Sequence, residues 1–262
     1  GYPAYTSAVR IAGATGISYE LSAASQWFPD LEALEQRDLS RVKLMWINYP
    51  HMPTGALATK DFFERIIAFG KKHNILICHD NPYSFILNDK PLSILSVDGA
   101  MEVAIELNSL SKASNMAGWR IGMLSAKEER IAEILRFKSN MDSGMFLPAQ
   151  LAAAQALRLE PSWYQQLNEV YAARRQRVRQ LMDLLDCRYE EQQVGLFVWA
   201  KIPEQYQSAY ELADDILQQA YVFITPGGIF GSAGDKYIRI SLCATEEVIV
   251  KAIERIKNIS KA

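Results

Sequence analysis

Short apolar runs of strand length alternate with amphipathic segments in the first half of the chain, and this alternation restricts the fold more than any other feature. The runs Val42–Asn48, Ile75–Asp80 and Val103–Asn108 are almost continuously apolar, which is typical of strands buried on both faces. The segment Thr59–His73, between the first two runs, has helical periodicity. Strands that alternate with helices predict an α/β fold, with a mainly parallel sheet and helices on both of its faces.

The same reading predicts further elements on either side of these runs. Strands are expected at Gly16–Leu21 and Arg120–Leu124. A helix is expected at Ala126–Phe137, and Ser125 and Glu128 at its beginning have the spacing of a capping box.

The pattern changes near Pro148, where helical segments take over. They cover 147–161 and then a long amphipathic run from Ser162 to about Leu185. Strand candidates follow at Gly195–Lys201, Val222–Thr225 and Tyr237–Ser241, with helices at Tyr210–Gln219 and Glu246–Ile259. This order is typical of a second, smaller α/β unit, so we expect a large domain over residues 1–160 and a small carboxyl-terminal domain over 161–262.

The composition excludes several classes of protein. A net charge of −2 over 262 residues gives no reason to expect nucleic acid or a membrane surface as a partner. The 3 cysteines are irregularly spaced, which argues against a disulfide framework and a zinc site and indicates a reducing compartment. No apolar run approaches the roughly 18 residues of a membrane span. We therefore expect a cytoplasmic protein.

Polar side chains follow three strands of the predicted sheet, at the carboxyl ends where ligands bind in open parallel sheets. The first of these strands, Val42–Asn48, runs into NYPHMPTG at 48–55. Asp80 and Tyr83 follow one strand, and Ser109–Lys112 follow the next, with Arg120 one loop further on. A lysine with a depressed pKa can form a Schiff base, and hydroxyls with a guanidinium suit a phosphate. A carboxylate beside an apolar strand needs a cationic partner. Together these residues predict a pocket for pyridoxal phosphate.

At this point the sequence resembles a known family. The run SLSKASNMAGWR (Ser109–Arg120) is similar to the lysine signature of the class I and II aminotransferases, pyridoxal-phosphate enzymes of the aspartate aminotransferase fold. Four other motifs resemble those of the family in the same order: GYP at 1–3, HMPTG at 51–55, DNPY at 80–83 and PGGIFGSAGDKYIRIS at 226–241. The resemblance covers the whole chain and implies fold type I of the pyridoxal-phosphate transferases, with residues 1–160 as a partial cofactor-binding domain.

The resemblance implies roles for three residues around the cofactor ring. Tyr2 would stack on the pyridoxal ring, and Tyr83 would form a hydrogen bond with the ring oxygen. Asp80 would pair with the protonated pyridine nitrogen, which lets the ring accept electrons released at the substrate Cα.

The remaining roles concern the phosphate, the reacting carbonyl and the substrate. Ser109, Ser111 and Arg120 would hold the phosphate. Lys112 would form the aldimine and then move a proton to and from the substrate Cα. Arg239 would bind the substrate α-carboxylate in a bidentate pair.

The implied activity is transfer of an amino group between an amino acid and a 2-oxo acid, with Lys112, Asp80 and Tyr83 as catalytic residues. The full-length protein is expected to be a homodimer. Two alternatives remain open: a C–S lyase of the same fold, and a non-catalytic aminotransferase-like sensor domain. The segment Ser139–Gln150 resembles the part that reaches across a dimer in the family, and it contains methionines and a phenylalanine but no arginine. This composition favours neutral or apolar substrate side chains.

The sequence departs from the family in two ways. Met52 stands where the family usually has an asparagine that donates to the cofactor's ring oxygen, and a thioether cannot donate a hydrogen bond. In addition, the family has about a third of its chain before the GYP segment. We therefore expect these 262 residues to be the carboxyl-terminal part of a longer enzyme, inactive on its own.

Overall fold

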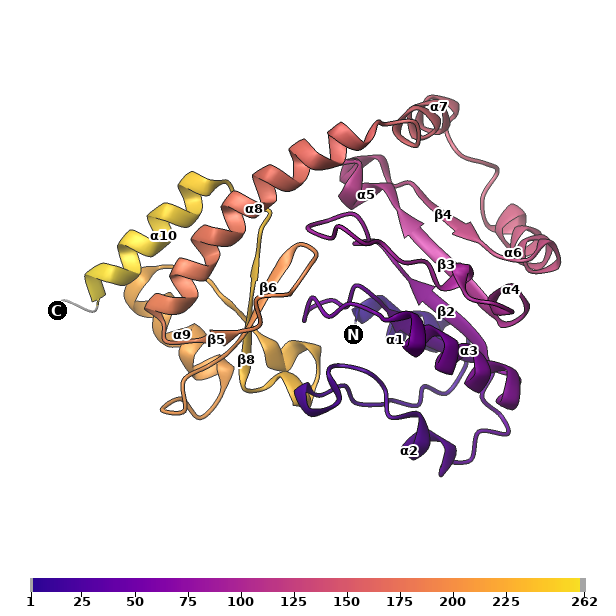
Figure 1. Ribbon diagram of the computed structural model, residues 1–262, viewed down its shortest axis with the longest axis horizontal. Coiled ribbons are helices and arrows are strands. Elements are labelled where there is room, and N and C mark those ends of the chain that lie inside the picture. Colours follow the sequence, from indigo (N-terminus) through magenta and orange to yellow (C-terminus); the bar gives the residue numbers. More distant parts are fainter. Residues whose placement is uncertain (1, 260–262) are drawn as a thin grey trace. The chain divides into compact units, whose positions relative to one another are not determined.

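The computed structural model describes residues 2–259, which group into two compact units (Figure 1). Unit 2 comprises Leu31–Pro50 and Leu57–Gln166. Unit 1 comprises the described residues up to Asp30, His51–Ala56 and the chain from Leu167 onward. The boundary expected at residue 160 lies near the last of these divisions, whereas the first thirty residues group with the carboxyl-terminal segment.

A ring cluster explains why the amino-terminal residues group with unit 1. The Trp27 ring meets the Trp199 ring edge-on with centroids 6.3 Å apart, and it meets the Tyr237 ring at 5.5 Å. Trp199 and Tyr237 in turn stack with centroids 5.1 Å apart. Aromatic contacts of this kind bury large apolar areas, so they tie the amino-terminal segment to the second sheet.

Unit 2 is built around a four-stranded sheet in the order β1-β2-β3-β4. The strands β1 (Leu44–Asn48), β2 (Leu76–Asp80) and β3 (Ala104–Ser109) run parallel to one another, and β4 (Gly122–Ser125) runs antiparallel to β3. The sheet is therefore mainly parallel, as predicted, and the fold class is confirmed.

Helix α3 (Lys60–His73) packs on this sheet through an apolar face that includes Phe63. The Phe63 ring meets the His79 ring of β2 edge-on at 5.0 Å. Thr59 caps the helix, because its Oγ1 accepts a hydrogen bond from the Phe62 amide at 3.0 Å. At the other end Asn74 adopts a left-handed conformation, which ends the helix before β2 begins.

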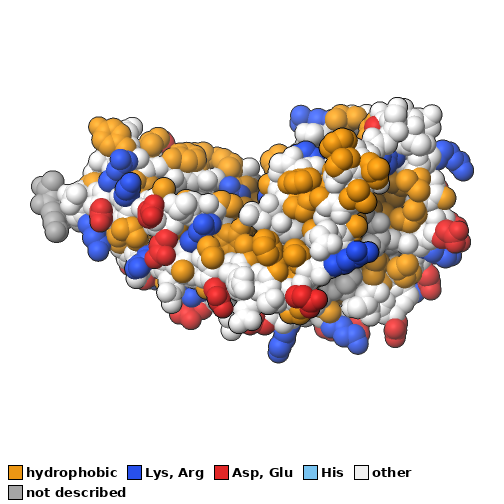
Figure 2. Space-filling model, turned by 90° about the horizontal axis from the view of Figure 1, so that it is seen from above, with side chains coloured by type: hydrophobic (Ala, Val, Ile, Leu, Met, Phe, Trp, Pro, Cys, Tyr) orange, Lys and Arg blue, Asp and Glu red, His pale blue; other side chains and the backbone are white. Residues whose placement is uncertain are grey.

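The other helices of unit 2 are shorter or more exposed. They are α2 (Leu31–Glu35), α4 (Ala100–Val103), α5 (Leu110–Ala113), α6 (Glu128–Met141), α7 (Leu147–Ala156) and the beginning of α8 (Pro161–Leu184). Helix α6 buries none of its residues, and Phe137 is 72% exposed. Many apolar side chains reach the surface in Figure 2. The predicted capping box is wrong: the N-cap of α6 is Lys127, without a side-chain bond, because Ser125 ends β4.

Unit 1 contains a second four-stranded sheet in the order β5-β6-β8-β7, with antiparallel pairing throughout. Its strands are β5 (Arg188–Tyr189), β6 (Phe197–Lys201), β7 (Thr225–Pro226) and β8 (Tyr237–Ser241), and its helices are α1 (Pro3–Ile11), the rest of α8, α9 (Ala209–Ala220) and α10 (Glu246–Ile259). Both α9 and α10 confirm the predicted helices. The strand expected at Val222–Thr225 is reduced to Thr225 and its neighbour.

The strand expected at Gly16–Leu21 is wrong, since this segment has no regular secondary structure. An extended segment becomes a strand only when a neighbour completes its backbone hydrogen bonds. Within residues 2–259, β1 pairs with β2 alone, and no strand pairs with Gly16–Leu21.

Candidate functional site

The carboxyl ends of β1, β2 and β3 lie at one edge of the unit 2 sheet because these strands are parallel and in register. Asn48 at the end of β1 is paired with Asp80 at the end of β2, and Asp80 is paired with Leu107 of β3. The side-chain nitrogen Nδ2 of Asn48 also donates to the Asp80 backbone carbonyl at 2.8 Å. The loops after β2 and β3, which carry most of the predicted site residues, therefore leave from the same edge.

The loop that carries Asp80 and Tyr83 is held by hydrogen bonds on both sides. The Asn81 backbone amide donates to the Leu107 carbonyl at 2.8 Å. Ser84 Oγ donates to Asn81 Oδ1 at 2.7 Å. Tyr83 is buried, and its carbonyl accepts from the Ile86 amide at 3.0 Å. A loop with this many bonds keeps the carboxylate and the phenol in a defined position.

Lys112 lies in the short helix α5, which directly follows β3. Ser109 caps this helix, since its Oγ accepts a hydrogen bond from the Ser111 amide at 3.1 Å. Ser109, Ser111 and Lys112 are each partly exposed, while Leu110 is buried and points into the core. The hydroxyls and the amine are therefore partly accessible to solvent.

Arg120 stands at the turn between α5 and β4. It adopts a left-handed conformation with φ of 55°, and its Nη1 donates to the Ala117 carbonyl at 2.9 Å. Gly122, two residues further on, lies so close to β3 that an added Cβ would be 2.9 Å from the Asn108 carbonyl oxygen. The guanidinium of Arg120 is thus exposed and bonded within its own turn, and β4 begins two residues after it.

Arg239 belongs to β8 in unit 1, where aromatic rings surround its guanidinium. The guanidinium carbon lies 4.3 Å from the Phe197 ring centroid and 4.6 Å from that of Phe230. Its Nη1 is also 3.5 Å from the Met52 sulfur. The residue that replaces the family's asparagine therefore contacts the arginine predicted to bind substrate, and a thioether can only accept there.

Tyr2 also lies in unit 1, at the N-cap of α1, and its side chain is exposed. Its ring meets that of Tyr5 edge-on with centroids 6.0 Å apart. Among the predicted site residues, six therefore come from unit 2, namely Asp80, Tyr83, Ser109, Ser111, Lys112 and Arg120, while Tyr2 and Arg239 come from unit 1.

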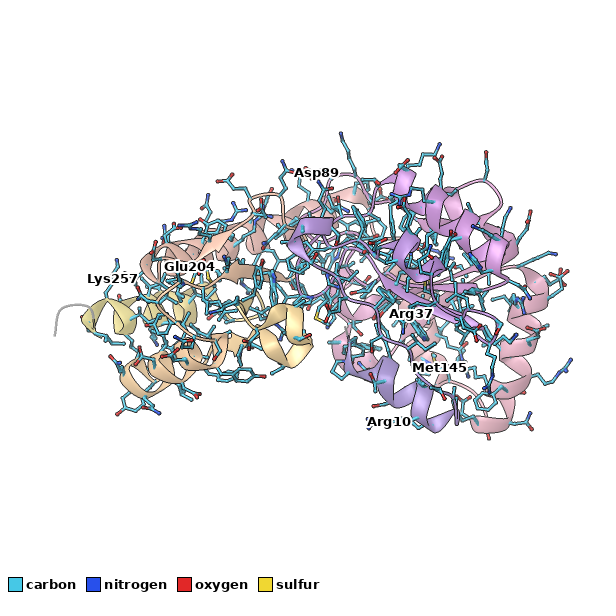
Figure 3. All side chains as sticks on the ribbon, turned by 90° about the horizontal axis from the view of Figure 1, so that it is seen from below. Arg10, Arg37, Asp89, Met145, Glu204 and Lys257 are labelled. Atoms are coloured by element: carbon cyan, nitrogen blue, oxygen red, sulfur yellow. The ribbon has the colours of Figure 1, made fainter. Side chains whose placement is uncertain are left out.

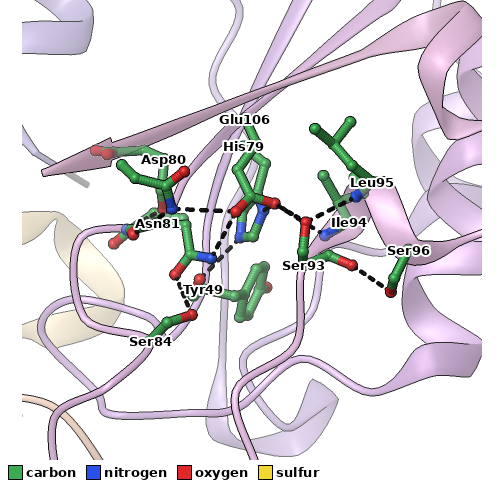
Figure 4. Close-up of polar contacts among 12 residues, drawn as sticks. Tyr49, His79, Asp80, Asn81, Ser84, Ser93, Ile94, Leu95, Ser96 and Glu106 are labelled. Atoms are coloured by element: carbon green, nitrogen blue, oxygen red, sulfur yellow. Dashed lines mark hydrogen bonds and ion pairs between the residues drawn. The ribbon is translucent and has the colours of Figure 1, made fainter. Parts of the chain in front are cut away.

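A buried carboxylate next to this site was not predicted. Glu106 lies in β3 and is 5% exposed, and it accepts hydrogen bonds from the residues around Asp80 (Figure 4). His79 is fully buried beside it. A charged residue inside the otherwise apolar run VAIELN, together with the histidine in ILICHD, was the signal that could have revealed this pair.

The side chains of unit 2 fit pyridoxal phosphate by their chemistry. Lys112 supplies the amine that the aldehyde requires, and Asp80 supplies a carboxylate on the neighbouring strand for the pyridine nitrogen. Ser109, Ser111 and Arg120 supply donors that suit a phosphate. By contrast, no group of three or more metal-ligating side chains occurs among residues 2–259. No helix in this part of the chain is both long and apolar enough to cross a membrane.

The chain is similar to curated proteins over almost its entire length. It is 41% identical to an LL-diaminopimelate aminotransferase of Dehalococcoides mccartyi, with 100% of this chain and 68% of the relative aligned. It is 37% identical to the LL-diaminopimelate aminotransferase of Oleidesulfovibrio alaskensis, covering 98% of this chain and 67% of that protein. The chain thus spans about two thirds of the length of these relatives.

Solved structures agree with these relatives. The apo structure of BacF from Bacillus subtilis superimposes with a TM-score of 0.92 at 35% identity, covering 99% of this chain and 66% of that one. An aromatic aminotransferase from Pyrococcus horikoshii has a TM-score of 0.89 at 28% identity, covering 100% of this chain and 71% of that one.

The family model for aminotransferase class I and II matches residues 1–256. The chain therefore belongs to the class I and II aminotransferases, pyridoxal-phosphate enzymes that move amino groups between amino acids and 2-oxo acids.

Proposed function

We propose that this chain carries the cofactor site of an enzyme that transfers an amino group from LL-diaminopimelate to a 2-oxo acid. The donor is suggested by the relatives from Dehalococcoides mccartyi and Oleidesulfovibrio alaskensis, at 41% and 37% identity. One observation carries the proposal. Asp80 ends β2 and Lys112 follows β3, and these adjacent parallel strands end at the same edge of the sheet.

Each predicted site residue of unit 2 has a defined role in this proposal. When bound, pyridoxal phosphate supplies an electron-accepting ring conjugated to a reactive aldehyde. Asp80 holds a proton on the pyridine nitrogen, and Tyr83 donates to the ring oxygen. The phosphate donors are Ser109, Ser111 and Arg120. Lys112 would hold the aldehyde carbon through Nζ, and the same atom would serve as the base for the substrate Cα proton.

The residues of unit 1 act on the ring face and on the substrate. Tyr2 stacks on the pyridine ring. Arg239 pairs with the substrate α-carboxylate through two parallel N–H donors. Phe197 and Phe230 lie within cation–π distance of this guanidinium, and they limit the directions in which it can turn. An orientation held in this way would fix the direction of the substrate carboxylate.

We further infer that the full-length enzyme is a cytoplasmic homodimer. The segment from the last residue of α6 to the residue before α7 supports the dimer, since its apolar side chains are exposed. Met141 is 70% exposed, Phe146 is 74% exposed, and Met145 (labelled in Figure 3) is 41% exposed. Large exposed apolar groups that cluster in one segment commonly mark a protein interface.

Covalent labelling tests the cofactor site. The chain is incubated with pyridoxal phosphate and reduced with borohydride, and the modified peptide is mapped by mass spectrometry. We expect stoichiometric label on Lys112 and none in Lys112→Ala. The matched control is Lys127→Ala, which removes an exposed lysine paired with Glu129 and should keep the label. Label that is absent, or that is scattered over several lysines, would contradict the proposed site.

A donor comparison tests the substrate. With the full-length enzyme, we expect turnover with LL-diaminopimelate and a 2-oxo acid to exceed that with methionine, leucine, phenylalanine or aspartate by at least tenfold. A preference for a neutral amino acid would favour the donor expected from the composition of Ser139–Gln150 and would contradict the donor suggested by the relatives. Release of pyruvate and ammonia from cystathionine without an oxo acid would indicate a lyase. Labelled but inactive protein would leave the sensor alternative.

A further inference from the structure

Glu106 is a buried carboxylate that gathers hydrogen bonds from several segments of unit 2. Its Oε2 accepts from Ser93 Oγ at 2.6 Å and from the Ile94 amide at 3.0 Å. Its Oε1 accepts from Asn81 Nδ2 at 3.1 Å and from Asn108 Nδ2 at 3.1 Å. Figure 4 shows these contacts converging on one carboxylate. Donors on both oxygens are the environment of an ionised carboxyl group.

His79 adds a further contact, and its neighbours define where its protons lie. Its Nε2 is 2.8 Å from the Tyr49 carbonyl oxygen. Since a carbonyl can only accept, Nε2 must carry a proton. Its Nδ1 is 3.4 Å from Glu106 Oε2, within ion-pair distance. A proton between Nδ1 and Oε2 is therefore required for this contact to be attractive.

The network includes the two neighbours of Asp80 in the chain. His79 immediately precedes Asp80 in β2, and Asn81 immediately follows it. Because side chains alternate along a strand, His79 points to the α3 side of the sheet and Asp80 to the other side. Asn108 donates both to Glu106 and to the Asn81 carbonyl, at 3.2 Å. Glu106 thus binds the residues on both sides of Asp80.

We propose that Glu106 is a positioning residue, which fixes the backbone around Asp80 and the end of β3, from which the chain continues to Lys112. The groups that meet the cofactor's pyridine nitrogen and its aldehyde would then keep a fixed spacing. The inference deepens the proposed function and rests on it. Through its bond to Asn108, Glu106 would also position Ser109, because Asn108 directly precedes Ser109 in the chain. One buried carboxylate would then align the ends of β2 and β3 together.

An amide at this position could not replace the carboxylate. Both oxygens of Glu106 accept hydrogen bonds, whereas a glutamine would present an NH₂ group on one side, facing donors. Either the donors of Oε1 or those of Oε2 would lose their acceptor. The change is small in volume, so it tests the hydrogen bonds more than the packing.

The experiment compares Glu106→Gln with the unaltered chain and with Glu102→Gln as a matched control. Glu102 undergoes the same chemical change at an exposed position, where it forms an ion pair with Lys71. We expect pyridoxal phosphate to bind Glu106→Gln about tenfold more weakly, which corresponds to ~1.4 kcal/mol. The pH at which the absorbance of bound cofactor changes should also move. Glu106→Asp, which keeps a carboxylate, should recover part of both effects.

A measurement without cofactor separates this inference from the proposed function. Amide exchange should become about tenfold faster at Asn81 and Ile94 in Glu106→Gln and should stay unchanged in Glu102→Gln. If the unaltered chain takes no label on Lys112, the proposed function fails, while the exchange rates still test the network itself.

The inference would be overturned by a lower Tm in Glu106→Gln with unchanged cofactor affinity, absorbance and exchange, since this result indicates a purely structural role. If Glu106→Gln does not fold, Asn81→Ala takes its place. This variant removes one donor and leaves the carboxylate intact. We expect about threefold weaker cofactor binding, and an affinity equal to that of the unaltered chain would also overturn the inference.

Discussion

A single glycine in the motif PGGIFG illustrates what the structure adds at the scale of residues. A glycine in such a motif is commonly a turn former, needed for its backbone conformation. The structure gives a different reason, which is close approach. A Cβ on Gly227 would be 2.4 Å from the Gly234 carbonyl oxygen and 2.5 Å from that of Tyr237. Backbone atoms cannot move aside as a flexible side chain can, so this position excludes any side chain.

We therefore expect Gly227→Ala to lower the free energy of unfolding by about 1–3 kcal/mol, the usual range for overpacking. Urea unfolding would measure the change. Gly118→Ala is the matched control, because a Cβ there would meet nothing within 4 Å, and it should cause no loss. Equal stability of both variants would show that the chain around Gly227 relaxes freely.

Met52 is a second residue whose environment was not visible in the sequence. The motif comparison identified only a missing donor. In the structure the side chain is 5% exposed, and its sulfur lies 3.5 Å from Arg239 Nη1. These residues are far apart in the chain, so only the fold could reveal that the substitution affects the arginine's surroundings.

At the scale of elements, local signals located most helices and strands, and α3 is the clearest case. Its predicted range differs from the observed one by a single residue, because Thr59 is the N-cap and not the first helical residue. Strands β2 and β3 also lie within one residue of their predictions. Apolar periodicity and capping residues are local properties, and they suffice for such elements.

The cap of α3 can be tested directly. Thr59→Ala removes the acceptor of the Phe62 amide, and we expect a loss of about 1 kcal/mol in the free energy of unfolding. Lys127→Ala provides the comparison at the N-cap of α6, where no side chain caps the helix, and it should change stability by less than about 0.5 kcal/mol. A similar loss in both variants would argue against a specific cap.

At the scale of the whole molecule, the buried network links the structure to its stability in acid. Burial alone would raise the pKa of Glu106, but hydrogen bonds from His79 and Ser93 outweigh it and lower the pKa to about 2. In the unfolded chain a glutamate titrates near its usual pKa of about 4.3. The unfolded state therefore binds more protons between these two values, and stability falls as the pH decreases through this interval.

We expect this group to contribute about 3 kcal/mol at neutral pH, an order-of-magnitude value from the difference between the two pKa values. The contribution should disappear progressively from about pH 4.3 down to pH 2. Urea unfolding at pH 6 and pH 3 would measure it in the unaltered chain and in Glu106→Gln, whose unfolding should depend less on pH. An identical pH dependence in the two proteins would contradict this assignment.

The sequence by itself determined the family, the α/β class and the identity of the candidate site residues. Motifs such as SLSKASNMAGWR and DNPY contain their chemistry in adjacent positions, and strand periodicity depends only on neighbouring residues. Tertiary structure alone decided which segments pair and which polar groups share a buried site. Gly16–Leu21 has the composition of a strand but pairs with none among residues 2–259. Glu106 and His79 meet only because β2 and β3 lie in register, and contacts between segments distant in sequence leave no local pattern to read.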